Sequence, residues 1–333
     1  MRVVSYCLES KGASRLPEGS LQSDTRSNPN SGIRTGVVIS EQNRDDRVLD
    51  LSDWIRSLPV SPEASRRNAL TGIDAPKGGI MRWLQSGTVT LGTEQSLIAE
   101  AGLGQAPTFH ELENIKLYAP VPRPGKIIGV GRNYADHAKE TGVDPFEKPR
   151  IIFKVPSSVA APGAPIPLPP EVSKLDFEAE LAVVIGAYAK NVSKENALQY
   201  VAGYTILNDA SAREFQFDIT PPQTTFAKSM DGFAPMGPWL VTPDEIPDPQ
   251  DLEVFCWLNG VQMQHGHTRD MLFPVATLIA YLSQFMTLEP GDVIATGTPA
   301  GIGAFRKPPL YLKPGDKLRF EVSKIGRLEH MII

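Results

Sequence analysis

Residues 176 to 186 read Asp-Phe-Glu-Ala-Glu-Leu-Ala-Val-Val-Ile-Gly, so that two carboxylates lead directly into an apolar run. An unbroken run such as Leu181 to Ile185 is typical of a β-strand that is buried on both faces. Side chains two residues apart on a strand point to the same face, which places Glu178 and Glu180 side by side. Carboxylates are costly to bury unless they are paired or bind a metal ion. The stretch therefore predicts a central strand with a candidate cation site, and a solvated acidic face is the alternative.

The composition indicates a soluble globular protein. The chain has 333 residues, of which 41% are apolar and 21% are charged, and it is long enough to bury a large core in one or two domains. A net charge of -5 argues against a nucleic-acid surface, because binding to phosphates needs clustered positive charge. No apolar run approaches the roughly 18 residues that a membrane span requires. We therefore expect a small-molecule partner, and neither nucleic acid nor a membrane.

The first residues carry no sign of a secretory signal peptide. Met1 to Leu8 has the apolar pattern of a strand, and Glu9 follows at once, so the long apolar segment of a signal peptide is missing. The only two cysteines, Cys7 and Cys256, make neither a disulfide framework nor a thiolate metal site. A cytoplasmic location is the default prediction, and a cleaved organelle sequence of a longer precursor is the alternative.

The stiff, proline-rich connector Ala119 to Gly125 predicts a boundary between two domains, 1–118 and 119–333. In the first part, Lys11 to Arg34 is rich in Ser, Pro, Asn and Gly without an apolar period, which predicts a long exposed loop. The remaining patterns of this part predict strands at 36–39 and 48–51 and short helices at 80–84 and 94–102. We expect a small α+β domain here.

Strands dominate the second part. Apolar runs predict strands at 126–131, 151–154, 202–207, 292–295, 318–322 and 328–332. Asn259-Gly260 between two apolar stretches is typical of a type I′ hairpin turn, because both residues tolerate positive φ. Helices are expected at 133–140, from Ser193 as the N-cap to Tyr200, and from Pro274 onward. Because strands do not alternate regularly with helices, the predicted class is a mixed, β-rich α+β fold.

A third carboxylate, Asp209, follows the buried strand that ends at Leu207. With Glu178 and Glu180 it would complete an all-oxygen site built from two strand regions. Such hard ligands suit Mg²⁺, Mn²⁺ or Ca²⁺ and do not favour zinc or copper. The alternative is an aspartate that only caps a turn.

His137 and Glu140 form a second candidate pair. The two residues are three positions apart, so on a helix they share one face, and the carboxylate could hold the imidazole as a general base. The alternative is a histidine on the surface.

Two cations and one loop complete the candidates. Lys228 lies in a largely apolar stretch, where a charge needs a partner. Arg213 follows the strand end at Asp209 and could clamp a carboxylate with its two-pronged guanidinium. The glycine-rich loop Thr296 to Gly303 could offer backbone N–H groups and hydroxyls to an anion. For both cations the alternative is an ordinary surface position.

Several of these segments resemble, in the same order, the motifs of the fumarylacetoacetate hydrolase family. The matching motifs are Gly131-Arg132-Asn133-Tyr134-Ala135-Asp136-His137, Phe177-Glu178-Ala179-Glu180, Asn208-Asp209-x-Ser211-Ala212-Arg213, Ala227-Lys228-Ser229 and Thr296-Gly297-Thr298-Pro299-x-Gly301-x-Gly303. They cover residues 119–333, and the tail from Phe305 to Asp316 is most similar to the branch of fumarylacetoacetate hydrolase domain-containing protein 2. Residues 1–118 are similar to the small N-terminal domain of that branch, with 11–34 as an insertion.

The resemblance implies a β-rich roll or sandwich, usually dimeric, that holds Mg²⁺ or Mn²⁺ through two glutamates and an aspartate. The implied metal ligands are Glu178, Glu180 and Asp209. The implied catalytic residues are the lid dyad and a lysine, namely His137, Glu140 and Lys228. The implied substrate contacts are Arg213, Gln216 and Thr298.

The activity that the resemblance implies is metal-dependent hydrolysis of a C–C bond in an acylpyruvate or a related 2,4-dioxo acid, with the dyad activating water. Two alternatives use the same residues: decarboxylation of a 2-oxo acid, and keto–enol tautomerisation of oxaloacetate. A metal-binding module without turnover is a further alternative. The complete dyad of His137 and Glu140 disfavours it, because a mere scaffold has no need of a general base.

Overall fold

The structure is a computed structural model that describes residues 1–8, 33–40, 46–71, 76–87, 99, 101–102, 107–140, 142, 144 and 146–333. These residues divide into two units, Met1–Tyr118 and Ala119–Ile333. The proline-rich connector begins at this division. Most of the predicted loop 11–34 lies outside the described residues, and Arg34 already belongs to a strand. Most of the helix predicted at 94–102 also lies outside them.

An antiparallel sheet forms the centre of the first unit. Its strand order is β4-β3-β2-β1, and β5 pairs with the other edge of β1. The bounds of these strands are β1 (Arg2–Leu8), β2 (Arg34–Ile39), β3 (Arg47–Asp50), β4 (Phe109–Glu111) and β5 (Ile115–Tyr118). The strands predicted for this unit, at 1–8, 36–39 and 48–51, are therefore confirmed.

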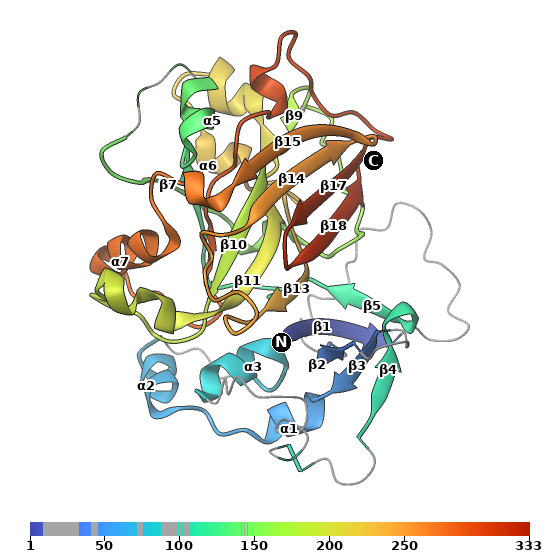
Figure 1. Ribbon diagram of the computed structural model, residues 1–333, viewed down its shortest axis with the longest axis vertical. Helices are drawn as coiled ribbons and strands as arrows, with labels where there is room; N and C mark the ends of the chain where they lie inside the picture. The colour runs from blue at the N-terminus through green and yellow to red at the C-terminus, as the bar shows by residue number, and fades with distance from the viewer. Residues whose placement is uncertain are drawn as a thin grey trace. The chain divides into compact units, whose positions relative to one another are not determined.

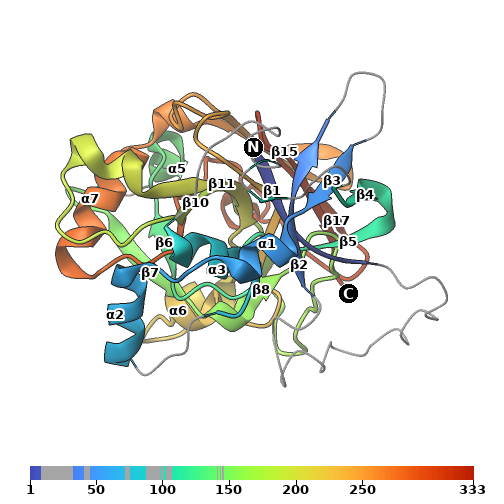
Figure 2. The same cartoon turned by 90° about the horizontal axis from the view of Figure 1, so that it is seen from below.

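Short helices accompany this sheet. They are α1 (Ser52–Ser57), α2 (Pro62–Thr71), α3 (Gly79–Ser86) and the 3₁₀ turn η2 (Leu112–Asn114). Helices α1 and α3 pack against each other and against β2 (Figure 2). The apolar residues of α3 are spaced by three and four positions, so Ile80, Trp83 and Leu84 are buried on one face. Gly87 ends the helix with a φ of +73°, which glycine adopts without strain.

The second unit contains a mixed sheet in the order β13-β11-β10-β16-β6-β7, with β8 beside β13. Strands β10, β11 and β13 of this sheet are labelled in Figure 1. Pairing is antiparallel except between β16 and β6 and between β13 and β8. The bounds of these strands are β6 (Ile127–Gly131), β7 (Arg150–Lys154), β8 (Val159–Ala160), β10 (Ala179–Ile185), β11 (Val201–Asn208), β13 (Ala234–Val241) and β16 (Val293–Ala295). Every residue of β10 is buried, which confirms the prediction of a central strand buried on both faces.

A second, antiparallel sheet in the order β15-β14-β17-β18 packs over β10, β11 and β13 (Figure 1). Its strands are β14 (Glu253–Leu258), β15 (Val261–His267), β17 (Lys317–Val322) and β18 (Gly326–Met331). The predicted hairpin is confirmed, because Asn259 and Gly260 join β14 to β15 with φ values of +50° and +84°. The predicted β-rich α+β class is confirmed as well.

The two faces of β10 differ in the side chains that they present. Leu181, Val183 and Ile185 belong to the main apolar core of this unit, and all three are fully buried. Glu180 alternates with them and therefore points to the opposite face. One strand thus anchors the packed core and presents a carboxylate on its other side.

The helical segments of the second unit are short, apart from α7. They are α5 (Ala135–Glu140), α6 (Thr224–Ala227), α7 (Val275–Phe285), the 3₁₀ segments η3 (Pro156–Ser158), η4 (Lys194–Tyr200), η6 (Thr268–Asp270) and η7 (Gly303–Phe305), and the π-helix η5 (Glu214–Asp218). The helix predicted from Pro274 is confirmed as α7. The helix predicted from Ser193 to Tyr200 is confirmed as the 3₁₀ helix η4, but the predicted cap is wrong, because the Ser193 side chain makes no capping hydrogen bond.

Candidate active site

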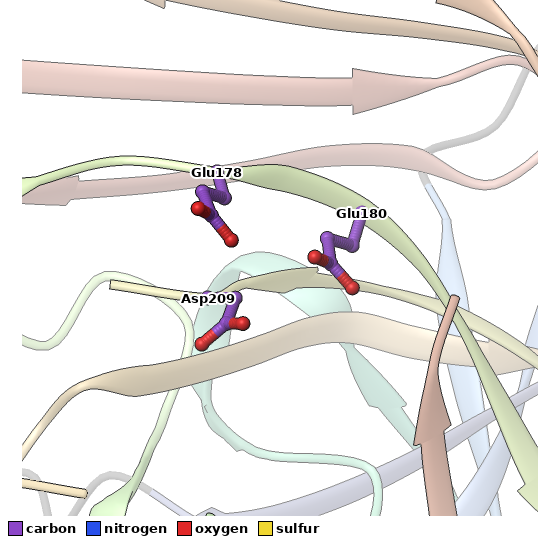
Figure 3. Close-up of side chains that lie close together, drawn as sticks. All are labelled: Glu178, Glu180 and Asp209. Atoms are coloured by element: carbon purple, nitrogen blue, oxygen red, sulfur yellow. The ribbon is translucent and has the colours of Figure 1, made fainter. Parts of the chain in front are cut away.

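The ends of two neighbouring strands bring three carboxylates together. Glu178 directly precedes β10, Glu180 is its second residue, and Asp209 directly follows β11. The backbone N–H of Asp209 donates to the carbonyl oxygen of Glu178 at 3.0 Å, which fixes the two strand ends against each other. All three side chains are buried and point into one space, with one oxygen of each within 4.8 Å of the others (Figure 3). We call these three residues the acidic trio.

Lys228 holds two members of the acidic trio. Its Nζ donates to Glu178 Oε2 at 2.9 Å, to Asp209 Oδ2 at 2.6 Å and to Ser211 Oγ at 2.9 Å. Only 3% of Lys228 is exposed, so the surface alternative for this lysine is excluded. Burial favours the neutral amine, but the carboxylates of Asp209 and Glu178 outweigh it and raise the pKa of Lys228.

Arg213 forms ion pairs with carboxylates of the protein itself. Its Nε donates to Asp176 Oδ2 at 2.9 Å, and its terminal nitrogens donate to Glu178 Oε1 and Gln216 Oε1, each at 2.7 Å. The guanidinium is buried, which excludes the surface alternative for Arg213 too. The carboxylate clamp foreseen from the sequence therefore exists, and its partners in this structure are Asp176 and Glu178.

Lys154 is a site residue that sequence reasoning missed. It ends β7, is almost fully buried, and its Nζ donates to Asp209 Oδ1 at 2.6 Å. Burial lowers the pKa of Lys154, and the charge of Asp209 opposes that effect. The available signal was a lysine directly after the apolar run Ile151 to Phe153, since a buried ammonium group needs an anion.

Glu180 differs from the other two members of the acidic trio. It accepts the backbone N–H of Gly297 at 2.8 Å, and no described lysine or arginine forms an ion pair with it. Burial and the charges of Asp209 and Glu178 raise the pKa of Glu180 well above its usual range. Glu178 is the opposite case: burial raises its pKa, but Lys228 and Arg213 outweigh this and lower it.

This arrangement fits a divalent cation. Asp176 and the acidic trio carry four carboxylates, which face the three buried cations Lys154, Arg213 and Lys228. One negative charge is left in excess, and it falls at Glu180. Oxygen-only ligands are the kind that hard cations such as Mg²⁺ and Mn²⁺ prefer. The acidic trio could therefore hold a divalent metal ion, as the sequence predicts.

His137 and Glu140 form the predicted pair on α5. His137 Nδ1 lies 3.1 Å from Glu140 Oε2, and only 5% of His137 is exposed, so the surface alternative is excluded. Nδ1 donates to the carboxylate, and Nε2 is the ring nitrogen outside this contact. The ring of Phe305 packs edge-on against the imidazole at 6.1 Å between centroids. Glu140 thus fixes the orientation of the imidazole.

The glycine-rich loop donates to carboxylates, but to those of the protein itself. The N–H groups of Gly297, Gly301 and Gly303 donate to Glu180, Glu140 and Asp176, at 2.8, 3.1 and 2.7 Å. The Thr298 hydroxyl donates to the carbonyl oxygen of Ala179 at 2.9 Å and accepts from Gln264 Nε2 at 2.8 Å. The loop therefore connects Glu180 of the acidic trio with Glu140 of the dyad through hydrogen bonds to its backbone.

A methyl group at Gly303 should disrupt the hydrogen bonds of this loop. A Cβ there would lie 1.9 Å from the carbonyl oxygen of Leu310 and 2.6 Å from Asp176 Oδ1. Gly303→Ala should lower the free energy of unfolding by about 3 kcal/mol, because a packed interior tolerates added volume poorly. Urea denaturation followed by circular dichroism measures this loss. Gly129→Ala is the matched control, since its Cβ would meet only ordinary contacts at 3.5 Å or more; equal urea midpoints for the two variants would contradict the account.

One cavity unites these groups. It encloses about 480 Å³, including the part open to solvent, and eight of the predicted site residues line it, namely His137, Glu178, Glu180, Asp209, Arg213, Gln216, Lys228 and Thr298. Glu140, the ninth, lies behind His137. Gln216 belongs to η5, and such π-helical turns are frequent at functional sites.

A second layer supports the acidic trio. The Asn208 side chain accepts the backbone N–H of Glu178 at 3.1 Å, and its amide nitrogen donates to His330 Nε2 at 3.1 Å. Burial lowers the pKa of His330 to about 3, so the ring stays neutral and can accept this bond. Sequence reasoning missed His330, because it lies more than a hundred residues from the strand end that it supports.

A buried carboxylate trio beside a His–Glu pair, in one cavity of a mixed sheet, defines an enzyme site able to hold a divalent ion. The model of the fumarylacetoacetate (FAA) hydrolase C-terminal domain matches residues 126–333. The chain therefore belongs to the fumarylacetoacetate hydrolase family, and the resemblance stated from its motifs is confirmed.

Three similar proteins illustrate the family. The mitochondrial oxaloacetate tautomerase FAHD2A of Homo sapiens is 41% identical over 252 residues, which cover 76% of this chain and 79% of that protein. The mitochondrial oxaloacetate tautomerase fahd2 of Xenopus laevis is 45% identical and covers 66% of this chain and 69% of that protein. The solved fumarylacetoacetate hydrolase of Exiguobacterium antarcticum has a TM-score of 0.72 at 31% identity, and 99% of each chain is covered.

The cytoplasmic location expected from the sequence is wrong by this comparison, because both oxaloacetate tautomerases are named as mitochondrial proteins. The expectation rested on composition and on the lack of a secretory signal, and neither feature distinguishes one aqueous compartment from another. Among the described residues, no helix is long and apolar enough to cross a membrane. The predicted homodimer stays a prediction.

Proposed function

We propose that the chain is a divalent-metal-dependent keto–enol tautomerase that acts on oxaloacetate or a closely related 2-oxo acid. The observation that carries the proposal is that the acidic trio shares one cavity with His137, whose Nδ1 is held by Glu140. The names of the relatives from Homo sapiens and Xenopus laevis support oxaloacetate as the substrate.

Glu178, Glu180 and Asp209 would hold the ion, which supplies electrostatic stabilisation of the enolate oxygen of a bound 2-oxo acid. The protein's own groups carry the proton. In the proposed reaction, His137 Nε2 accepts a proton from C3 of the keto acid and returns it to the oxygen on C2, which gives the enol. Glu140 keeps Nδ1 protonated throughout, so the imidazole always presents the same nitrogen to the substrate.

Three buried cations stabilise this arrangement. Lys228 and Arg213 neutralise Glu178, and Lys228 and Lys154 neutralise Asp209, so these two carboxylates can stay ionised in a buried site. Their hydrogen bonds also fix the orientation of both carboxylates. We expect these cations to position the carboxylates, since each already donates to partners within the protein.

Hydrolysis of a C–C bond in an acylpyruvate is a second candidate. The same Nε2 of His137 could take a proton from water, and the similar solved structure from Exiguobacterium antarcticum is named as a fumarylacetoacetate hydrolase. Decarboxylation of oxaloacetate is a third use of the same residues, and it would yield pyruvate. These candidates differ in their products, so one assay separates them.

The assay mixes Mg²⁺-loaded protein with the enol form of oxaloacetate and, separately, with an acylpyruvate, and follows enol absorbance and pyruvate together. We expect fast decay of the enol without pyruvate above the rate given by Mg²⁺ alone, and an intact acylpyruvate. Chelator-treated protein is the control. Pyruvate from the acylpyruvate would favour hydrolysis, and pyruvate from oxaloacetate would favour decarboxylation. If pyruvate forms in either assay and the enol of oxaloacetate does not decay faster than with Mg²⁺ alone, the proposed tautomerase activity is refuted.

A further inference from the structure

Two arginines that line the cavity are not part of the site described so far. Arg132 and Arg150 line the same cavity as the acidic trio, and both are half-buried. Within the described part of the chain, neither side chain forms an ion pair or a side-chain hydrogen bond. Their one aromatic contact places the guanidinium of Arg132 over the ring of Phe146, 5.7 Å from its centroid.

The strand register holds these two arginines together. Strands β6 and β7 pair Gly131 with Arg150, and Arg132 follows Gly131 directly. A Cβ on Gly131 would lie 3.4 Å from Arg150 Cδ and 3.2 Å from Ile152 Cδ1, so the glycine leaves room for the arginine stem to cross the strand end. We call Arg132 and Arg150 the arginine pair.

The backbone at Arg132 is itself unusual. Its φ of +57° lies in the left-handed region, which residues other than glycine rarely adopt and which costs free energy. Backbone strain of this kind is concentrated at ligand-binding and active sites. The conformation is consistent with a side chain that is positioned for binding and not for packing.

Alternation along β7 relates the arginine pair to the acidic trio. Arg150, Ile152 and Lys154 lie on one face of this strand, and Lys154 contacts Asp209. Arg150 stands four residues from Lys154, a separation of about 13 Å along the strand. The face thus presents one cation at the acidic trio and a second, unpaired cation at the other end of the same wall.

Charge distinguishes the arginine pair from the three cations that contact the acidic trio and Asp176. Lys154, Arg213 and Lys228 each form ion pairs with buried carboxylates. The two arginines face each other instead, and burial together with the charge of Arg150 lowers the pKa of Arg132. Two unpaired guanidinium groups in a partly desolvated cavity attract an anion, and their planar forks match a carboxylate.

We propose that the arginine pair is a subsite for the distal carboxylate of a dicarboxylic 2-oxo acid whose 2-oxo acid end lies at the acidic trio. This inference rests on the proposed function for the position of the reacting end and adds the residues that bind the second carboxylate. The cavity then selects short diacids over monocarboxylic 2-oxo acids, because only a diacid carries a second carboxylate for the arginine pair.

Binding of two stable hydroxy acids tests the subsite without turnover. Malate and lactate share the chelating 2-hydroxy acid end, and only malate has a second carboxylate. In calorimetric titrations of the Mg²⁺-loaded protein, we expect malate to bind at least roughly 10-fold more tightly than lactate, as two charge-assisted hydrogen bonds predict. Arg132→Gln and Arg150→Gln should each remove most of this preference and leave lactate affinity unchanged.

The controls separate the subsite from the fold and from the proposed function. Arg123→Gln removes an exposed arginine of the same unit and should keep the preference for malate, while Arg132→Lys should retain part of it. Equal malate affinity in wild type and both glutamine variants, or no preference in the wild type, would overturn the inference. If the preference depends on the arginine pair but oxaloacetate is not tautomerised, the subsite stands and the proposed function fails.

Discussion

Glu180→Gln should abolish metal-dependent turnover, with kcat/KM for oxaloacetate falling about 1,000-fold or more, a change of about 4 kcal/mol in the activation free energy. The substitution keeps the shape of the side chain and an oxygen for the N–H of Gly297, but it removes the one carboxylate of the acidic trio that lacks a cationic partner. Without its charge, the divalent ion is held by two carboxylates that are already neutralised by lysine and arginine. Steady-state kinetics with Mg²⁺ measures the loss.

The same variant should not unfold the protein. Burial and two neighbouring carboxylates disfavour the ionised form of Glu180, so its neutral replacement should leave the metal-free protein at least as stable as the wild type. Added Mg²⁺ should raise the Tm of the wild type and not that of the variant. Glu171→Gln, which changes an exposed glutamate of the same unit, is the control. Wild-type activity in Glu180→Gln would show that the acidic trio is not the metal site.

His137→Asn should lower kcat by about 100- to 10,000-fold and leave the affinity for Mn²⁺ unchanged. Asparagine can still donate to Glu140 from nearly the position of Nδ1, but it has no counterpart of Nε2 to accept a proton. Metal binding should persist because His137 is not a member of the acidic trio. Kinetics and a Mn²⁺ titration by electron paramagnetic resonance measure the two effects separately.

An exposed histidine serves as the matched control for that experiment. His265→Asn changes a ring on β15 that is half-exposed and lies outside the cavity, so it should leave both kcat and Mn²⁺ affinity unchanged. Full turnover in His137→Asn would contradict the role of Nε2. Mn²⁺ binding without any turnover in the wild type would favour the alternative of a metal-binding module.

Local patterns were sufficient to predict much of the fold. The apolar run of β10, the Asn259-Gly260 turn and the three- and four-residue spacing of α7 each fix a structure through neighbours in sequence. The cap of η4 could not be predicted in this way, because the Ser193 side chain makes no capping hydrogen bond although serine is a favoured N-cap residue. A favourable residue type indicates a cap but does not ensure it.

The candidate site was predictable where its residues belong to compact motifs. The acidic trio and the dyad of His137 and Glu140 lie in short segments with a recognisable order. Lys154, Asp176 and His330 were missed because each acts on a partner that is remote in the sequence. The glycine-rich loop shows the same limit, since its sequence indicates N–H donors for an anion but does not indicate that Glu180, Glu140 and Asp176 receive them.

The charge pattern of the cavity gives each end of the substrate a separate partner. At one end, the acidic trio could hold a divalent ion. At the other end, Arg132 and Arg150 form no ion pair with any residue that the structure describes. A dicarboxylic 2-oxo acid complements both ends at once, which makes the proposed function and the proposed subsite parts of one electrostatic description.

A crystal structure with Mn²⁺ and oxalate tests the central claim most directly, because oxalate reproduces the chelating oxygens of a 2-oxo acid and Mn²⁺ scatters anomalously. We predict one anomalous peak held by Glu178, Glu180 and Asp209, with both oxalate carboxylates bound to the same ion and His137 Nε2 facing them. An empty acidic trio with Mn²⁺ or oxalate bound elsewhere would contradict the account.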